Sequence, residues 1–217
     1  MKILCSALFM ALLASCSKQK IYVPQADISL ETQVSDYSSI AMLYKQVNDS
    51  VFIDVKDAGT ITQTHWLFEV DKRLPLKLVI PEVKNLQQKK YKKAEDKMMP
   101  NYYTYMDTIA KTVAFMPMDK VFYETDKPHD LLNLDALLVT VQANGDAFIN
   151  NEKIDLVTIN EWLKAQFPET PVVLALAFNE ELSFEKYMQA KLNLAKITLP
   201  QVRVLTTEVI FKKTSLN

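Results

Sequence analysis

The stretch from Ala136 to Phe211 constrains the fold of this chain more than any other, because its pattern reads as a complete small unit. It opens with an apolar, β-rich run over residues 137–143. Asn144 and Gly145 follow, and an Asn-Gly pair between β-rich runs is the strongest short signal for a hairpin turn. Residues 147–150 are therefore expected to return as the second strand.

Two helices and two more strands are expected after this hairpin. Thr158 and Ser183 each precede an amphipathic segment and are expected to cap a helix. The β-branched, apolar runs at 172–178 and 202–211 predict strands, so the order is strand, strand, helix, strand, helix, strand. The inner helix faces are expected to carry Ile159, Trp162, Leu163 and Phe167 in the first helix, and Phe184, Tyr187, Met188, Leu192 and Ala195 in the second.

A weaker copy of the same pattern can be traced upstream. Without a gap, residues 40–80 align with 136–176, which pairs Asn48 with Asn144, Phe52 with Phe148, Trp66 with Trp162 and Pro75 with Pro171; beyond this the register changes, and Tyr105 and Met106 match Tyr187 and Met188. An internal repeat of this kind predicts two similar units in one chain. The elements expected for the first copy are strands at 40–47 and 51–55, a helix at 62–73, a strand at 76–80, a helix at 102–115 and a strand at 120–124.

The order of elements, with its turn-then-short-strand opening and a helix before a Pro-led apolar strand, resembles the periplasmic domain of the ExbD/TolR family. The resemblance covers the last third of the chain. It implies an α+β fold of two tandem ExbD/TolR-like units, each strand-strand-helix-strand-helix-strand with the helices on one face of a small mixed sheet. It also implies work with a proton-driven motor of the ExbB or TolQ kind, and pairing with itself and with other envelope proteins.

Members of that family carry a functional aspartate in a membrane helix, and this chain departs from the pattern there. Its N-terminal apolar run, residues 3–14, contains no acidic residue and is too short to span a bilayer. No residue of the family's proton path can therefore be carried over.

The first residues instead read as a bacterial lipoprotein signal. Lys2 precedes the apolar run, and Leu13, Ala14, Ser15 and Cys16 match a lipobox, so that residues 1–15 would be removed and Cys16 would carry the lipid. The alternative is an ordinary secretory signal. Ser17 is not the aspartate that retains lipoproteins in the inner membrane, which favours the outer membrane, facing the periplasm. The predicted domains are the signal at 1–15, the lipidated N-terminus and tether at 16–35, a first unit at 36–125, a linker at 126–135 and a second unit at 136–217.

Composition excludes several kinds of chemistry. The two cysteines, Cys5 and Cys16, are lost with the signal or lipidated, and the two histidines, His65 and His129, stand far apart without metal-ligand spacing. Two glycines, Gly59 and Gly145, are too few for phosphate-cradling loops. A net charge of −1 gives no general attraction for nucleic acid. No catalytic site, cofactor or metal is expected.

One cluster of charge stands out within the first unit. Lys89, Lys90, Lys92 and Lys93 crowd a short segment and could meet anionic lipid headgroups, lipopolysaccharide, peptidoglycan carboxylates or an acidic partner. The alternative is a solvated extension without a partner.

The sequence therefore predicts a lipid-anchored, non-enzymatic envelope protein. It would act as an accessory or interaction module of an ExbB/ExbD/TonB-like or Tol-like biopolymer transport system, in contact with a membrane through its anchor and capable of self-association. The alternative is a structural lipoprotein that binds peptidoglycan or another envelope component.

Overall fold

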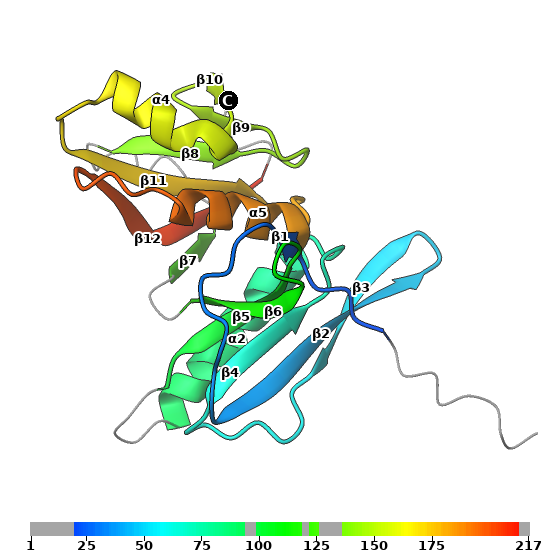
Figure 1. The fold of residues 1–217 in the computed structure, drawn as a ribbon. Helices are drawn as coiled ribbons and strands as arrows, with labels where there is room; N and C mark the ends of the chain where they lie inside the picture. The colour runs from blue at the N-terminus through cyan, green and yellow to red at the C-terminus, as the bar shows by residue number, and fades with distance from the viewer. Residues whose placement is uncertain (1–19, 94–98, 119–121, 126–135, 213–217) are drawn as a thin grey trace, which may run out of the picture.

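The computed structural model describes residues 20–93, 99–118, 122–125 and 136–212 (Figure 1). Its fold is α+β, with two mixed six-stranded sheets. The first part of the chain forms β1 (Gln25–Ala26), β2 (Tyr37–Val47), β3 (Ser50–Lys56), β4 (His65–Val70), α2 (Leu76–Lys93), β5 (Asn101–Asp107), β6 (Thr112–Pro117) and β7 (Phe122–Thr125). The second part forms β8 (Leu137–Val141), β9 (Ala147–Ile149), β10 (Glu152–Ile154), the 3-10 turn η2 (Leu156–Thr158), α4 (Ile159–Gln166), β11 (Val172–Asn179), α5 (Phe184–Ala195) and β12 (Val202–Phe211).

The two sheets repeat one order of strands. The first runs β1-β5-β4-β2-β3, with β6 also paired to β5, and the second runs β10-β9-β8-β11-β12-β7. In each, an antiparallel hairpin is followed by a strand parallel to the first hairpin strand, then a helix, then another parallel strand. The hairpin β2–β3 thus corresponds to β8–β9. The strand, helix and strand that follow, β4, α2 and β5, correspond to β11, α5 and β12. The second unit alone inserts β10, η2 and α4 before its central strand.

The two units meet where β4 leads into α2 and where β11 leads into α5. Asp71 and Asn179 follow the same geometry, since each side chain accepts a hydrogen bond from the backbone N–H two residues later, at 3.1 and 2.9 Å. Pro75 and Ser183 then precede the helices and face one another in an antiparallel bridge. The same local structure therefore occurs twice, and its two copies touch.

Four backbone hydrogen bonds cross this junction in two equivalent pairs. They run from Leu76 N to Leu182 O (3.0 Å), from Phe184 N to Leu74 O (2.8 Å), from Lys77 N to Glu180 O (2.8 Å) and from Glu185 N to Lys72 O (3.0 Å). The donors belong to the first turns of the helices, where N–H groups have no partner within the helix. Each unit thus caps the helix of the other, as in a two-fold symmetric dimer whose subunits share one chain.

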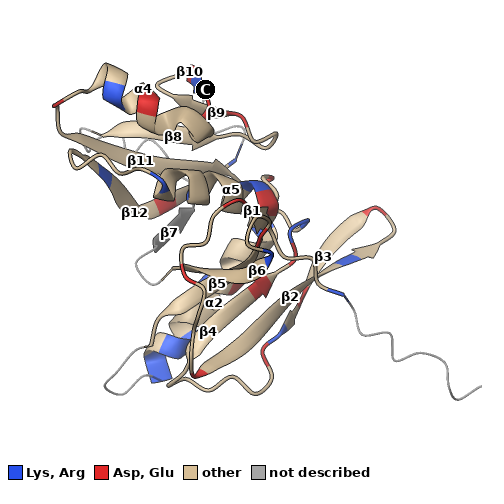
Figure 2. Ribbon diagram, viewed as in Figure 1, with Lys and Arg blue, Asp and Glu red and all other residues tan. Residues whose placement is uncertain are grey.

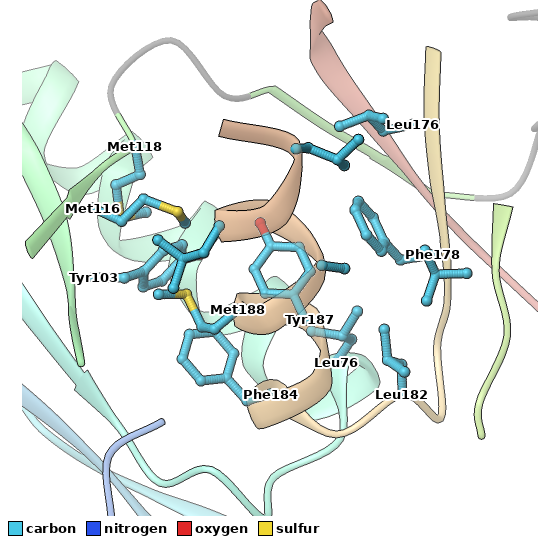
Figure 3. Packing of buried hydrophobic residues seen from close by; sticks show 14 of the residues in the cluster. Leu76, Tyr103, Met116, Met118, Leu176, Phe178, Leu182, Phe184, Tyr187 and Met188 are labelled. Atoms are coloured by element: carbon cyan, nitrogen blue, oxygen red, sulfur yellow. The ribbon is translucent and has the colours of Figure 1, made fainter. Parts of the chain in front are cut away.

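The core is continuous across both units, because α5 lies between the two sheets (Figure 3). Tyr103 of the first sheet contacts Phe184 and Tyr187 of α5, with ring centroids 5.1 and 6.3 Å apart, and Phe178 of the second sheet stacks edge-on against Tyr187 at 5.0 Å. All four of these rings are fully buried. Edge-to-face aromatic pairs contribute about 0.5–1.5 kcal/mol each beyond their buried area, so α5 stabilises both sheets together.

The elements expected for the second unit are confirmed. The hairpin, the strands at 172–178 and 202–211, and both helices lie within two residues of the predicted bounds. Ser183 caps α5 through its side chain, which accepts from Lys186 N. Thr158 precedes α4 without a side-chain cap bond, and Asp155 instead caps the preceding turn. Helices α4 and α5 share one cluster with alternate residues of β11, while Ala175 and Ala177 face the other side of the sheet.

In the first unit, only the hairpin and a short strand near residue 122 are confirmed. Residues 62–73 contain β4 rather than a helix, residues 76–80 begin α2 rather than a strand, and residues 102–115 form the β5–β6 hairpin rather than a helix. The run His65–Val70 is buried on both faces, as in parallel strands, and such short apolar runs have no period that separates strand from helix. Pro75 precedes a helix here, whereas Pro171 precedes a strand.

The expected alignment of the repeat is correspondingly wrong beyond the hairpins. Trp66 lies in β4 and Trp162 in α4, so the two tryptophans are not equivalent. β7, expected to close the first unit, pairs with β12 in the second sheet.

Residues 20–31, expected to form part of a free tether, lie on the folded body. β1 pairs in parallel with β5, Glu31 bridges to Phe115, and Asp27 forms an ion pair with Lys196 at 2.9 Å.

Candidate functional site

The β2–β3 hairpin reaches beyond the sheet that carries it (Figure 1). β2 pairs with β4 only over Tyr37–Met42, whereas its pairing with β3 continues to Val47. Residues 43–54 therefore form a two-stranded ribbon, which we call the hairpin arm. Tyr44, Val51 and Ile53 of the arm pack against the core, and an added third strand would stabilise the arm further.

β3 also ends its sheet, and among the described residues no strand pairs with its outer edge. The equivalent strand of the second unit, β9, is covered by β10, which pairs with it antiparallel over three residues. The chain thus contains the same edge twice, once closed by an extended segment and once open. Open edges of this kind recruit extended peptides.

The position of the turn determines which backbone N–H and C=O groups of β3 point out of the open edge. Asn48 and Asp49 join the strands as a two-residue turn. In such a hairpin, alternate residues direct their backbone N–H and C=O groups away from the partner strand. Counted from the turn, these residues in β3 are Val51, Ile53 and Val55.

The faces of the arm combine apolar and charged side chains. Val47 and Phe52 are about half exposed. Asp54 forms ion pairs with Lys56 at 3.0 Å and Lys45 at 3.2 Å, and hydrogen bonds from these two lysines, Lys56 first, hold the pKa of Asp54 below its ordinary value. Charges beside an open edge discourage unselective pairing, so the arm is suited to a specific partner.

The predicted lysine cluster lies at the C-terminal end of α2 (Figure 2), and the structure divides it. Lys89, Lys92 and Lys93 are exposed, as expected for an anion-binding patch. The prediction is wrong for Lys90, which is fully buried and whose ammonium group donates to Thr64 O, Met99 O and Asn101 Oδ1 at 3.0, 2.8 and 2.8 Å. Lys90 falls on the inner face of α2 with Val83 and Leu86, and it ties the helix to two loops.

Two adjoining grooves run along α5. The first, of about 520 Å³, lies between α5 and the β8–β9 turn, and the second, of about 430 Å³, lies between α5 and residues 25–27. Gln189 and Asn193 line both. The amide groups of these two side chains suit ligands rich in hydroxyl or peptide groups.

The first groove is bordered by ordered polar contacts. Lys186 Nζ donates to Asn144 O at 2.6 Å, and Lys153 pairs with Asp146 at 2.9 Å. The hydrogen bond from Lys153, and after it that from Asn144, lowers the pKa of the Asp146 carboxyl. The β8–β9 turn is thereby fixed against α5.

Glu208 of β12 is the most deeply buried carboxylate in the described chain, and its contacts account for it. Tyr187 donates its hydroxyl to Glu208 at 2.8 Å, and Lys191 forms an ion pair with it. Glu208 lines neither groove. Its contacts tie α5 to β12, which is a structural role.

The other residues singled out in the sequence are not brought together. His65 contacts Pro100 O through Nδ1 at 3.2 Å, and Cys16 and His129 lie outside the described residues. Within the ranges that the structure describes, no group of three or more His, Cys, Asp or Glu side chains is placed to hold a metal ion. Over the same ranges, no helix has the length and apolar character needed to cross a bilayer.

Sequence reasoning missed both the hairpin arm and the junction between the units. A signal for the junction was present, because Asp71, Leu74 and Leu76 recur as Asn179, Leu182 and Phe184. The alignment that pairs Trp66 with Trp162 does not place these residues opposite one another.

Comparisons of the chain with protein-family models, with curated protein sequences and with solved structures each return no match.

Proposed function

We propose that the protein is a lipid-anchored, non-enzymatic envelope protein of two tandem ExbD/TolR-like units. It serves as an accessory or interaction module of an ExbB/ExbD/TonB-like or Tol-like transport system, on the periplasmic side of the outer membrane. The lipobox at Cys16 supports the anchor, and the order of elements over 136–211 supports the family resemblance.

The interaction role rests on a difference between the two similar units: the hairpin strand β9 is covered by β10, whereas the equivalent strand β3 ends its sheet. The junction satisfies the first-turn N–H groups of α2 and α5 between the two units. β9 is closed by β10, which leaves β3 as the edge on which the repeat offers a place for an extended segment. Of the two equivalent hairpin strands, β3 and β9, only β3 is therefore left uncovered by another strand of the described residues. The partner of the protein is an extended segment that pairs with β3 as β10 pairs with β9.

The test is crosslinking in intact cells, followed by affinity capture of the tagged full-length chain. Two variants separate edge pairing from contact with the face of the arm. Ile53→Pro removes an outward N–H while leaving the ladder to β2, because proline is tolerated at such edge positions. Phe52→Ala removes an exposed ring and leaves the edge backbone intact.

Capture of ExbB-like, ExbD-like or TonB-like proteins by the wild type, reduced several-fold by Ile53→Pro and little by Phe52→Ala, is the expected result. Thermal unfolding of each variant checks that the fold is retained. Capture that Ile53→Pro leaves unchanged would remove edge pairing as the binding mode, and capture of wall fragments alone would remove the transport role.

The alternative is a structural lipoprotein that binds peptidoglycan, and the amide-lined grooves beside α5 favour it. Glycan hydroxyl groups and peptide stems would pair with Gln189 and Asn193. Co-sedimentation with purified peptidoglycan checks this reading. Binding lost in Gln189→Ala with Asn193→Ala, but kept when Lys89, Lys92 and Lys93 are neutralised, would favour the grooves over the lysine patch.

A further inference from the structure

The first described residues are fastened to the first unit around Tyr22. Tyr22 O accepts a hydrogen bond from Lys72 N at 2.7 Å, and Tyr22 N donates to the Asp71 carboxylate at 3.4 Å. The guanidinium of Arg73 lies over the rings of Tyr22 and Tyr44, at 5.1 and 4.2 Å from their centroids. We call this group of contacts the Tyr22 clamp.

A partly buried ion pair between Arg73 and Asp71 holds the clamp in place. Arg73 forms two hydrogen bonds of 2.8 Å with the Asp71 carboxylate, whose side chain is only 1% exposed. Burial acts against ionisation of Asp71, but the hydrogen bonds from the Arg73 side chain and backbone outweigh it and lower the pKa of that carboxyl. Arg73 is thereby fixed in position for both tyrosines, and the guanidinium still reaches solvent.

Beyond the clamp, the chain stays attached to the body. Pro24 O and Ala26 O accept hydrogen bonds from Met106 N and Thr108 N, at 2.9 and 2.8 Å. Ser29 donates to Asp107 at 2.6 Å, and Leu30 N donates to the hydroxyl of Tyr105 at 2.9 Å. Residues 22–31 therefore act as a fixed strap and add no reach to a tether.

This fastening limits the distance between the folded body and the lipid of the proposed anchor. Six residue steps lead from Cys16 to the fastened Tyr22, and a fully extended chain spans about 3.3–3.6 Å per residue, so the reach is at most about 22 Å. The headgroup layer of a bilayer is itself about 5–8 Å thick on each side. A body fastened at Tyr22 is therefore held close to the headgroup layer, with at most a short gap between them.

The surface at the clamp has the chemistry of a membrane interface. Lys20 lies over the ring of Tyr22 at 5.2 Å, and Arg73 remains about half exposed beside Tyr44. Cationic groups attract lipid phosphates, and tyrosine rings with polar tips favour the headgroup region. Figure 1 shows that the described chain begins beside β2 and β3, so this surface adjoins the hairpin arm.

We infer that the Tyr22 clamp holds the body against the phosphate headgroups of the membrane that carries the anchor, with Lys20, Tyr22, Tyr44 and Arg73 facing the lipid. The inference rests on the proposed lipid anchor. It places the hairpin arm beside the membrane surface, so a strand that pairs with β3 must approach along the bilayer.

The test uses the lipidated full-length chain in vesicles of phosphatidylethanolamine and phosphatidylglycerol that contain a headgroup-linked quencher. In the proposed lipoprotein Cys5 is removed with the signal and Cys16 carries the lipid, so one introduced cysteine takes a fluorophore selectively. Gln46→Cys places it on the side of β2 that carries Tyr44, and Lys164→Cys places it on α4, at the opposite end of the molecule in Figure 1. Quenching is expected to be several-fold stronger at position 46.

A matched control inserts ten Gly and Ser residues between Ser17 and Lys18, which leaves the clamp intact and adds up to about 35 Å of reach. The ratio of quenching at 46 to that at 164 is expected to fall towards one. Equal quenching at both positions without the insertion would overturn the inference. A ratio that the insertion leaves unchanged would overturn the role of the short tether, because the clamp surface alone would then hold the body at the lipid. Mass spectrometry of the mature N-terminus tests the anchor separately, because absence of acyl chains at Cys16 would contradict the proposed function itself.

Discussion

At the scale of single residues, neighbouring lysines of α2 have opposite roles. Lys89 is exposed, whereas Lys90 is fully buried and is placed over the ring of Trp66 at 5.0 Å with three oxygen acceptors. A buried ammonium is tolerated only where hydrogen bonds replace its water, and here all three donors are used. Lys90 therefore stabilises the fold, although it lies in a lysine-rich segment.

Lys90→Met should lower the free energy of unfolding by about 2–4 kcal/mol, because three oxygens lose a charged donor in a buried place. Lys89→Met is the matched control and should change it by less than about 0.5 kcal/mol. Urea denaturation of both variants measures the difference. Equal stability of the two would contradict the buried position of Lys90.

At the scale of elements, the decisive feature is the junction at Pro75 and Ser183. Two strand-to-helix connections share one geometry although most of their residues differ, and each supplies carbonyl groups to the first turn of the other's helix. The ion pairs Lys72–Glu185 and Lys77–Glu181 flank it on both sides, at 3.1 and 2.6 Å. The packing of the units therefore depends mainly on backbone groups, which explains why different side chains can support it.

Ser183→Pro should be tolerated, with a change in unfolding free energy within about 1 kcal/mol. Ser183 has a φ of −67°, which proline adopts without strain, and Pro75 occupies the equivalent place. The small cost reflects the lost cap bond to Lys186 N.

The contrasting variant is Glu185→Pro, which removes the N–H that donates to Lys72 O and should cost at least about 2 kcal/mol. Glu185→Ala controls for the lost ion pair with Lys72. Thermal unfolding ranks the three variants. Severe destabilisation by Ser183→Pro would refute the equivalence of the two junctions.

At the scale of the whole molecule, two repeated units share one core. α5 belongs to the second unit in sequence but is buried between both sheets (Figure 3), and the strap at residues 22–31 contacts both units. Separating the units would expose Tyr103, Phe184 and Tyr187, and fully burying such a side chain is worth about 1.5–3 kcal/mol. The repeated units therefore depend on one another.

The chain should unfold in one cooperative transition, and its two tryptophans can report on it separately. Trp66 lies in the first sheet and Trp162 in α4, so Trp66→Phe and Trp162→Phe each leave a probe in one unit. In each variant, fluorescence and circular dichroism should give coincident urea midpoints. A fluorescence midpoint that departs from the circular dichroism midpoint of the same variant would show that the units unfold independently.

The sequence by itself determined the second unit, because its Asn-Gly turn, its capping serine and its long β-branched runs are local signals that tertiary contacts did not override. It also determined that the fold is α+β. Tertiary structure decided the first unit. The run at His65–Val70 is a strand because β2 and β5 pair with it along both edges. The segment with Tyr103 is a strand because β4 and β6 pair with it and α5 packs on the Tyr103 ring. The hairpin arm, the buried position of Lys90 and the Tyr22 clamp likewise depend on contacts between segments far apart in the chain. Local periodicity carries no information on such contacts.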